Sequence, residues 1–199
     1  MKIPHRLIVP VLLPFATLAA ISCTSITPET RTAASVKQGV PGGEVVQTHK
    51  ITATVTGIDN AKRKVTLVTR DGKKFTVTAG PGVANFKQIR IGDQLTATLT
   101  EQIVIRMAKP GEKTVDGSAA MVGLAPVGAK PGAMAAETAQ VTATVSAIDL
   151  KHHKATLRFA DGSTKTVAVR QDVDLTKRKI GEKVVIRSTE MFAILLEKP

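Results

Sequence analysis

Apolar and polar residues alternate with a period of two through most of the chain beyond residue 47, and this pattern predicts β-strands. Ile51, Ala53 and Val55 share one parity, while threonines occupy the positions between them. Such β-branched alternation is typical of a strand with one buried face. The parity then slips at Gly57, which predicts a β-bulge that bends the strand.

The same pattern occurs again ninety residues later. Of the 29 residue pairs between 51–79 and 141–169, 13 are identical, far more than two unrelated strand-forming segments share through composition. An internal duplication indicates two units of one architecture. In a chain of 199 residues, each unit is close to the smallest size at which a core alone stabilises a fold.

Each copy continues with turns and further strands. In the first copy, Val65 and Leu67 alternate with polar residues, and Asp71-Gly72 predicts a tight hairpin. The later features of this copy are a third strand at Phe75, Val77 and Ala79, an irregular connector at 80–91, a strand at Leu95, Ala97 and Leu99, a turn at Thr100-Glu101, and a strand at Ile103 and Ile105. The second copy repeats them at Ala155, Leu157 and Phe159, Asp161-Gly162, Val167 and Val169, Gly181-Glu182, Val184 and Ile186, Thr189-Glu190, and Phe192 and Ile194. Three strands, a connector and a hairpin form the strand order of a five-stranded OB-type barrel.

We therefore expect an all-β fold with two tandem five-stranded OB-like β-barrels, at 47–109 and 138–199. The two segments outside these repeats show no strand pattern. Residues 23–46 are rich in Thr, Ser, Gly and Pro, and residues 110–137 in Gly, Ala and Pro. These compositions predict a flexible tether and an interdomain linker.

Residues 1–22 have the organisation of a secretory leader. Lys2 and Arg6 precede an apolar run that Pro10 and Pro14 interrupt. A permanent membrane span requires about 20 mostly apolar residues, so this interrupted run is typical of a leader and not of a span. The leader ends in Leu18-Ala19-Ala20-Ile21-Ser22-Cys23, which is similar to a bacterial lipobox. This resemblance implies a lipid-modified Cys23 and a membrane contact through that anchor. The alternative, a plain leader with an idle thiol, is less favoured because a lone reactive thiol is a liability outside the cytosol.

A further resemblance covers residues 48–199. The pattern "ATV-x-x-ID…K-x-T-L…DG…V…GD…TE", with an intervening "KPG", resembles a group of uncharacterised bacterial envelope proteins. The tyrosine that often precedes their Thr-Glu pair is here Leu99 and Ser188. Because Thr24 rather than Asp follows Cys23, the lipoprotein resemblance implies the periplasmic face of the outer membrane.

The chain is strongly basic, with 28 Lys and Arg against 16 Asp and Glu and a net charge of +12. Loss of the leader with Lys2 and Arg6 leaves +10, which favours contact with anionic envelope polymers. A solvated face without a ligand is the alternative. The candidate binding residues lie in three clusters: Lys62, Arg63 and Lys64; Lys73 and Lys74; Lys177, Arg178 and Lys179.

Metal binding, catalysis and nucleic-acid binding each have weaker support. His152-His153 is the one candidate metal pair, and a periplasmic copper carrier is the alternative function, but the first copy has Lys62-Arg63 at these positions, as expected of a solvated turn. Asp59, Asp71, Asp149 and Asp161 are explained by local turns. Phe75, Phe86, Phe159 and Phe192 share the parity or alignment of core residues, which leaves no aromatic platform for bases. The sequence predicts a non-catalytic envelope protein, without cofactor or bound metal, that contacts anionic polymers or partner proteins.

Overall fold

The computed structural model describes residues 27–83, 85–126 and 128–198, and they form an all-β protein built on one ten-stranded antiparallel sheet. The predicted all-β class is confirmed. The strands are β1 (Glu29–Ser35), β2 (Gly42–Asp59), β3 (Lys64–Thr69), β4 (Lys74–Thr78), β5 (Gln94–Met107), β6 (Gly117–Leu124), β7 (Gly132–Asp149), β8 (Lys154–Phe159), β9 (Thr164–Ala168) and β10 (Lys183–Glu197). Two short 3-10 helices, η1 (Phe86–Gln88) and η2 (Leu175–Lys177), complete the fold. Within these described ranges, no helix has the length and apolar character needed to cross a membrane.

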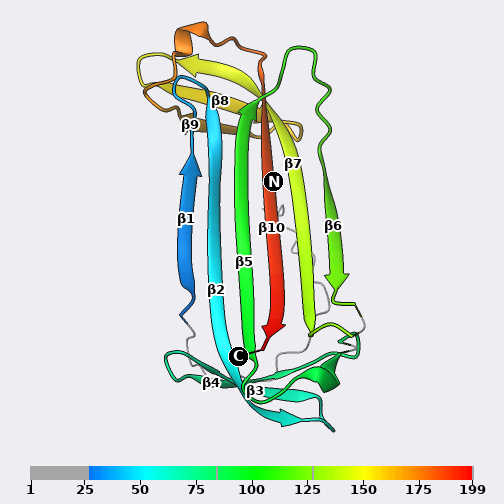
Figure 1. Cartoon of the computed structure of the whole chain (residues 1–199). Coiled ribbons are helices and arrows are strands. Elements are labelled where there is room, and N and C mark those ends of the chain that lie inside the picture. Colours follow the sequence, from blue (N-terminus) through cyan, green and yellow to red (C-terminus); the bar gives the residue numbers. More distant parts are fainter. Residues whose placement is uncertain (1–26, 84, 127, 199) are drawn as a thin grey trace, which may run out of the picture.

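The long strands β2, β5, β10 and β7 lie side by side and connect two small caps at the ends of the molecule (Figure 1). One edge of β2 pairs with β1 along its first half and with β3 along its second half. In the same way, β7 pairs first with β6 and then with β8. Predicted bulges occur in both strands, between Val55 and Gly57 and between Val145 and Ala147, where the strands bend into the caps.

The duplication appears in the structure as an internal two-fold relation. Leu99 and Ile103 of β5 correspond to Ser188 and Phe192 of β10, and the pairing is reciprocal: Leu99 opposes Phe192 and Ile103 opposes Ser188. The axis passes through the pair in which a residue meets its own counterpart, Glu101 opposite Glu190. Both repeats therefore contribute equally to one sheet.

The predicted turns at Thr100-Glu101 and Thr189-Glu190 are wrong, because both pairs lie within continuous strands. The physical reason is parity: alternation runs without a slip from Leu95 through Glu101 to Ile105, and Thr-Glu lacks a residue that favours a turn. Each strand thus passes through the centre and ends in the cap of the other repeat. The sheet is not closed, and two separate five-stranded barrels are not confirmed.

Two segments expected to lack strands contain them. The predicted tether 23–46 includes β1 and the start of β2, and the predicted linker 110–137 includes β6 and the start of β7. Neither shows an alternation of apolar and polar residues, because β1 consists of charged residues, Thr, Ala and Ser, while Gly, Ser and Ala fill five of the eight positions of β6, and both are exposed edge strands. The duplicated unit consequently begins at β1 and β6. The predicted leader, 1–22, and Cys23 lie outside the described residues.

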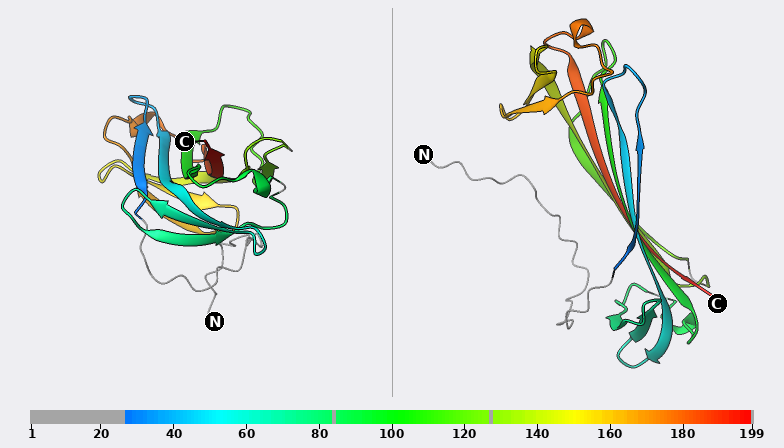
Figure 2. Two further views of the ribbon diagram at one scale, coloured as in Figure 1. Left: turned by 60° about the horizontal axis from the view of Figure 1, so that its bottom comes forward. Right: turned by 90° about the vertical axis from the view of Figure 1, so that its left-hand side faces the viewer.

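The first cap comprises β3, β4 and η1, with the ends of β2 and β10, and it encloses a core. Its buried residues are Ala53, Val55, Val65, Leu67, Phe86, Ile89 and Leu196. The second cap comprises β8, β9 and η2, with the ends of β7 and β5, and its buried cluster is smaller: Ala143, Val145, Leu157 and Val184. Both caps project from the same face of the sheet (Figure 2).

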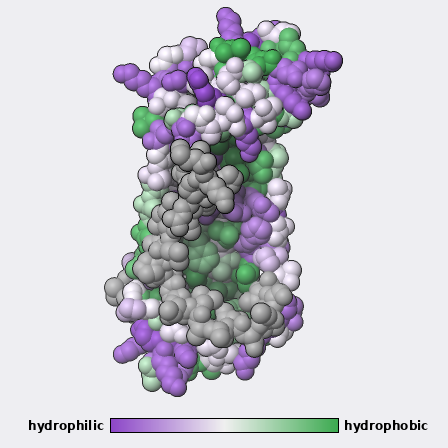
Figure 3. Space-filling model, turned by 180° about the vertical axis from the view of Figure 1, so that it is seen from behind, coloured by the Kyte–Doolittle hydropathy of each residue, from purple (hydrophilic) through white to green (hydrophobic). Residues whose placement is uncertain are grey.

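The sheet face between the caps forms a trough that is apolar toward each cap and is crossed at its centre by a row of acidic residues, Glu101, Glu190 and Glu137. Cross-strand register places Val45, Ile103, Val141 and Phe192 on this face, and each is more than two-fifths exposed. Figure 3 shows apolar surface in the hollow between the more hydrophilic ends of the molecule. The opposite face carries many threonines, such as Thr96, Thr98 and Thr100 of β5, together with exposed apolar residues such as Met191 and Leu195. Exposed apolar surface beside each cap, as at Val45 and Ile103, marks a binding surface more often than a plain solvent face.

The central row of glutamates, in which Glu190 faces Glu101 on β5 and Glu137 on β7, leads to a first prediction. Like charges that face each other directly across strands are destabilising, so Glu190→Gln should stabilise the fold by about 0.5 kcal/mol. The urea midpoint should rise at low salt, and the gain should vanish at high salt, where the Debye length is about 3 Å. Glu197→Gln, which pairs with Gln94 near the end of β10, is the matched control and should change nothing. A gain that persists at high salt would contradict the electrostatic origin.

Candidate ligand-binding site

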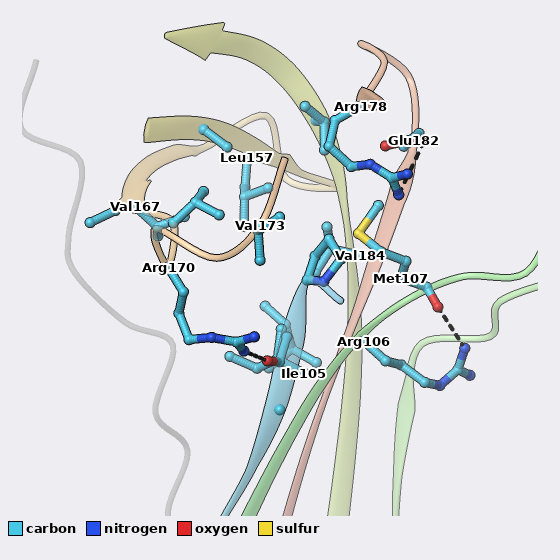
Figure 4. Close-up of a pocket in the computed structure, with 18 of the residues that line it drawn as sticks. Ile105, Arg106, Met107, Leu157, Val167, Arg170, Val173, Arg178, Glu182 and Val184 are labelled. Carbon is cyan, nitrogen blue, oxygen red and sulfur yellow. Dashed lines mark hydrogen bonds and ion pairs between the residues drawn. The ribbon is translucent and has the colours of Figure 1, made fainter. Parts of the chain in front are cut away.

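A cavity of about 530 Å³ lies between the second cap and the sheet. Its walls are mainly aliphatic and come from β8, β9, the η2 loop and the ends of β5, β7 and β10 (Figure 4). Leu157 and Val167 line one side, Met107 and Val184 line another, and Ile105 connects the cavity to the trough. This size lies within the range of roughly 300–1,000 Å³ typical of small-molecule sites.

The duplication explains why the second cap is hollow. The chain places Lys165 where the first cap has Phe75, Leu175 where it has Phe86, and Ala155 where it has Val65. Phe159 in place of Thr69 restores only part of the lost volume. The first cap is therefore packed with its own side chains, whereas the second has space for a ligand.

A clasp built on Arg170 holds the segment 37–42 beside the cavity. Its guanidinium donates hydrogen bonds to the carbonyl oxygens of Lys37, Val40 and Gly42, and it is paired with Asp172 at 2.8 Å. Asp172 in turn accepts the amide hydrogen of Gly39 at 2.8 Å. The side chain of Arg170 is thus occupied by protein groups.

The clasp predicts a pH dependence. Hydrogen bonds from Arg170 and from the Gly39 amide lower the pKa of Asp172 to about 2, below the ordinary value of about 3.9. Because the folded-state value is depressed, this stabilisation is present above about pH 4 and is lost as the pH falls toward 2. Asp172→Asn should lower the thermal midpoint at pH 5, and the difference from wild type should disappear near pH 2. A constant difference over this range would contradict the clasp.

Arg178 and Glu182 lie together on the cavity wall (Figure 4). One guanidinium nitrogen of Arg178 is 3.8 Å from Oε1 of Glu182, too far for a hydrogen bond of ordinary length. The other carboxylate oxygen, Oε2, is buried and accepts no hydrogen bond from the described residues. Both side chains are about two-thirds buried, at 32% and 29% exposure.

The equivalent position in the first cap is fully paired. Asp93, 2% exposed, receives the ammonium of Lys130 at 2.7 Å on both carboxylate oxygens and the amide of Arg90 at 2.8 Å. Burial acts to raise the pKa of Asp93, but the hydrogen bonds from Lys130 and Arg90 outweigh it, so the pKa lies below its ordinary value. Lys130 comes from the second repeat, and its equivalent in the first repeat, Val40, lies beside the second cap. The second carboxylate thus lacks the ammonium that its counterpart has.

The three predicted basic clusters do not form one surface. The clusters at 62–64 and 73–74 belong to the first cap and the cluster at 177–179 to the second, at opposite ends of the molecule (Figure 1). Lys62, Lys64, Lys74 and Lys179 are exposed, while Lys73 pairs with Asp71 at 3.1 Å and Lys177 with Asp174 at 3.4 Å.

Arg63 has a structural environment. Its guanidinium donates to the carbonyl oxygens of Ala79, Gly80 and Val83, and it lies 4.8 Å from the ring centroid of Phe86. These contacts join the cap connector to the β3 turn and leave little of the side chain for an external ligand.

The histidine pair occupies the corresponding turn of the second cap. His153 shares the positive φ of Arg63, 54° against 52°, and its Nε2 lies 3.0 Å from the carbonyl oxygen of Arg170. His152 is 2.7 Å from Asp149. Asp59 and Asp149 accept the backbone amides of Lys62 and His152, which confirms that local turns explain them. Asp71 and Asp161 likewise accept hydrogen bonds from Thr69 and Ser163 within their hairpins.

Among the phenylalanines, the core assignment of Phe192 is wrong, since 43% of this residue is exposed in the trough. Phe86 is buried, and Phe75 and Phe159 pack against their cap cores. The reason is that Phe192 lies mid-strand, beyond the reach of either cap. Within the described part of the chain, no three His, Cys, Asp or Glu side chains form a group suited to a metal ion.

Sequence reasoning missed the cavity, the Arg170 clasp and the role of Glu182. The differences between the two copies contained a signal. Two core residues of the first copy, Phe75 and Ile89, are replaced in the second copy by the charged residues Lys165 and Arg178. Comparison with models of protein families finds no match to the chain, and comparison with curated proteins also finds none.

Proposed function

We propose that this chain is a lipid-anchored, non-catalytic envelope protein that binds an amphiphilic molecule with an aliphatic chain in the cavity of the second cap. The observation that carries this proposal is the contrast between the two caps. Equivalent positions hold Phe75 and Phe86 in one and Lys165 and Leu175 in the other, and a cavity of about 530 Å³ lies beside the second pair.

The chemistry of the walls favours an aliphatic ligand. Burial of each CH₂ group contributes about 0.8 kcal/mol, and the walls offer mostly Val, Leu, Ile and Met side chains. Beyond Ile105 the apolar surface continues to Ile103 and Val45, up to the acidic row at Glu101, so the end of a chain longer than the cavity retains contact with the sheet (Figure 3).

A single-chain fluorescent probe, dansyl-undecanoic acid, tests this function. We expect saturable binding to the purified chain with a rise in fluorescence. The double variant Lys165→Phe/Leu175→Phe, which installs the residues of the first cap, should weaken binding at least about tenfold, because it fills the cavity. Absence of saturable binding by the wild type, or full binding by a folded double variant, would overturn the proposal.

The anchor has its own test. Cys23→Ser should abolish acylation and leave the protein soluble or unprocessed, because the thiol is the acceptor of the lipid. Metabolic labelling with a fatty acid and fractionation of membranes measure the two effects. Labelled, membrane-bound variant protein would refute the anchor.

A further inference from the structure

The least satisfied polar group beside the cavity is the carboxylate of Glu182. Its Oε2 is buried without a hydrogen-bond partner among the described residues, and its ion pair with Arg178 is loose at 3.8 Å. A buried charged acceptor without a donor carries a large desolvation cost in free energy. A ligand group that donates a hydrogen bond to this oxygen removes that cost, so the bond contributes more than one formed at an exposed carboxylate.

The first cap shows which donor fits this position. There the carboxylate of Asp93 holds a primary ammonium, Nζ of Lys130, at 2.7 Å from both oxygens. The backbone around the two carboxylates is the same: Asp93 and Glu182 each accept the amide of the equivalent valine, Val55 or Val145, through their main-chain carbonyl, at 2.8 Å. The side chains around them differ: Val40 replaces Lys130, Arg178 replaces Ile89, and Glu182 has one methylene more than Asp93.

Of the arginines on the cavity wall, Arg178 has the most donors to spare. Arg106 is bound in bidentate fashion to Glu112, at 2.9 and 2.6 Å, and Arg170 is engaged by Asp172 and three carbonyl oxygens. Among the described residues, the guanidinium of Arg178 has only its loose contact with Glu182. A guanidinium in this state suits a phosphate, which it can bind through two parallel N–H groups.

On the basis of the proposed function, we infer that the cavity selects a single-chain phospholipid with an ethanolamine head, whose ammonium replaces that of Lys130 on Glu182 and whose phosphate binds Arg178. The zwitterionic head matches the Arg178–Glu182 pair in charge, and the acyl chain follows the walls toward Val167 and Ile105 (Figure 4). The head of the ligand completes a polar arrangement that the first cap builds from its own residues.

Three lysophospholipids with the same acyl chain distinguish the parts of this inference. Titrations below the critical micelle concentration would compare heads of ethanolamine, choline and glycerol. Choline keeps the charge and the phosphate but lacks N–H donors, and glycerol lacks the ammonium. We expect the ethanolamine lipid to bind about tenfold or more tightly than either, because a hydrogen bond to a buried charge is lost with the others.

Two variants complete the test. Glu182→Gln should bind all three lipids with similar affinity, and Arg178→Ile, the first-cap residue, should weaken all three. Equal binding of the three heads by the wild type would overturn the inference and leave the proposed function standing. No binding of any lipid would overturn both the inference and the proposed function. Palmitate has an anionic head without an ammonium, so tighter binding of palmitate than of the ethanolamine lipid would overturn the inference and indicate an anion site at Arg178.

Discussion

Lys130→Met should destabilise the protein by about 3–5 kcal/mol, because it leaves the carboxylate of Asp93 buried without its partner. Asp93 is 2% exposed and Lys130 is 23% exposed at the side chain, so water replaces little of the lost interaction. The free energy of unfolding from urea titrations at pH 7 measures the effect. The second cap has an aliphatic residue, Val40, at the equivalent position, but its carboxylate, Glu182, borders a cavity.

The pH dependence identifies the cause. In the wild type the pKa of Asp93 is below its ordinary value. The Asp93–Lys130 pair therefore stabilises the folded state above about pH 4, and this contribution is lost as the pH falls. Without Lys130 burial should raise the pKa, and the variant should recover stability relative to wild type as the pH falls. Asp93→Asn combined with Lys130→Met should restore part of the loss at pH 7. A loss that is independent of pH and unchanged in the double variant would show that packing of the lysine stem, not charge, is responsible.

Local features of the fold could be predicted from the sequence because they depend on neighbouring residues. Alternation at Ile51, Ala53 and Val55 gave a strand with one buried face, and the parity slip at Gly57 gave the bulge. The Asp71-Gly72 turn follows from the positive φ of Gly72, 79°. Each of these was confirmed.

The assembly of the sheet depends on partners that a single repeat does not reveal. Ile103 and Ile105 fit a returning strand of a closed barrel as well as a strand that continues toward the other repeat. Pairing of β5 with β10 on one edge, over fourteen residues, and with β2 on the other resolves this choice, because the two neighbours together satisfy the backbone groups of the continuing strand. The cavity was equally hidden, since the volume at Lys165 and Leu175 is decided by which side chains the two caps bring together.

Leu67→Ala should cost about 4 kcal/mol, and the equivalent Leu157→Ala about half as much. Leu67 is fully buried in the packed first cap, so its removal creates a cavity whose lining loses contacts on every side. Leu157 already lines the open cavity and is 8% exposed, so truncation enlarges a space that exists. Urea unfolding of the two variants, which change the same residue type at duplicated positions, measures the difference directly. Equal losses would mean that the second cap is as tightly packed as the first in solution, and a ligand would then have to open it.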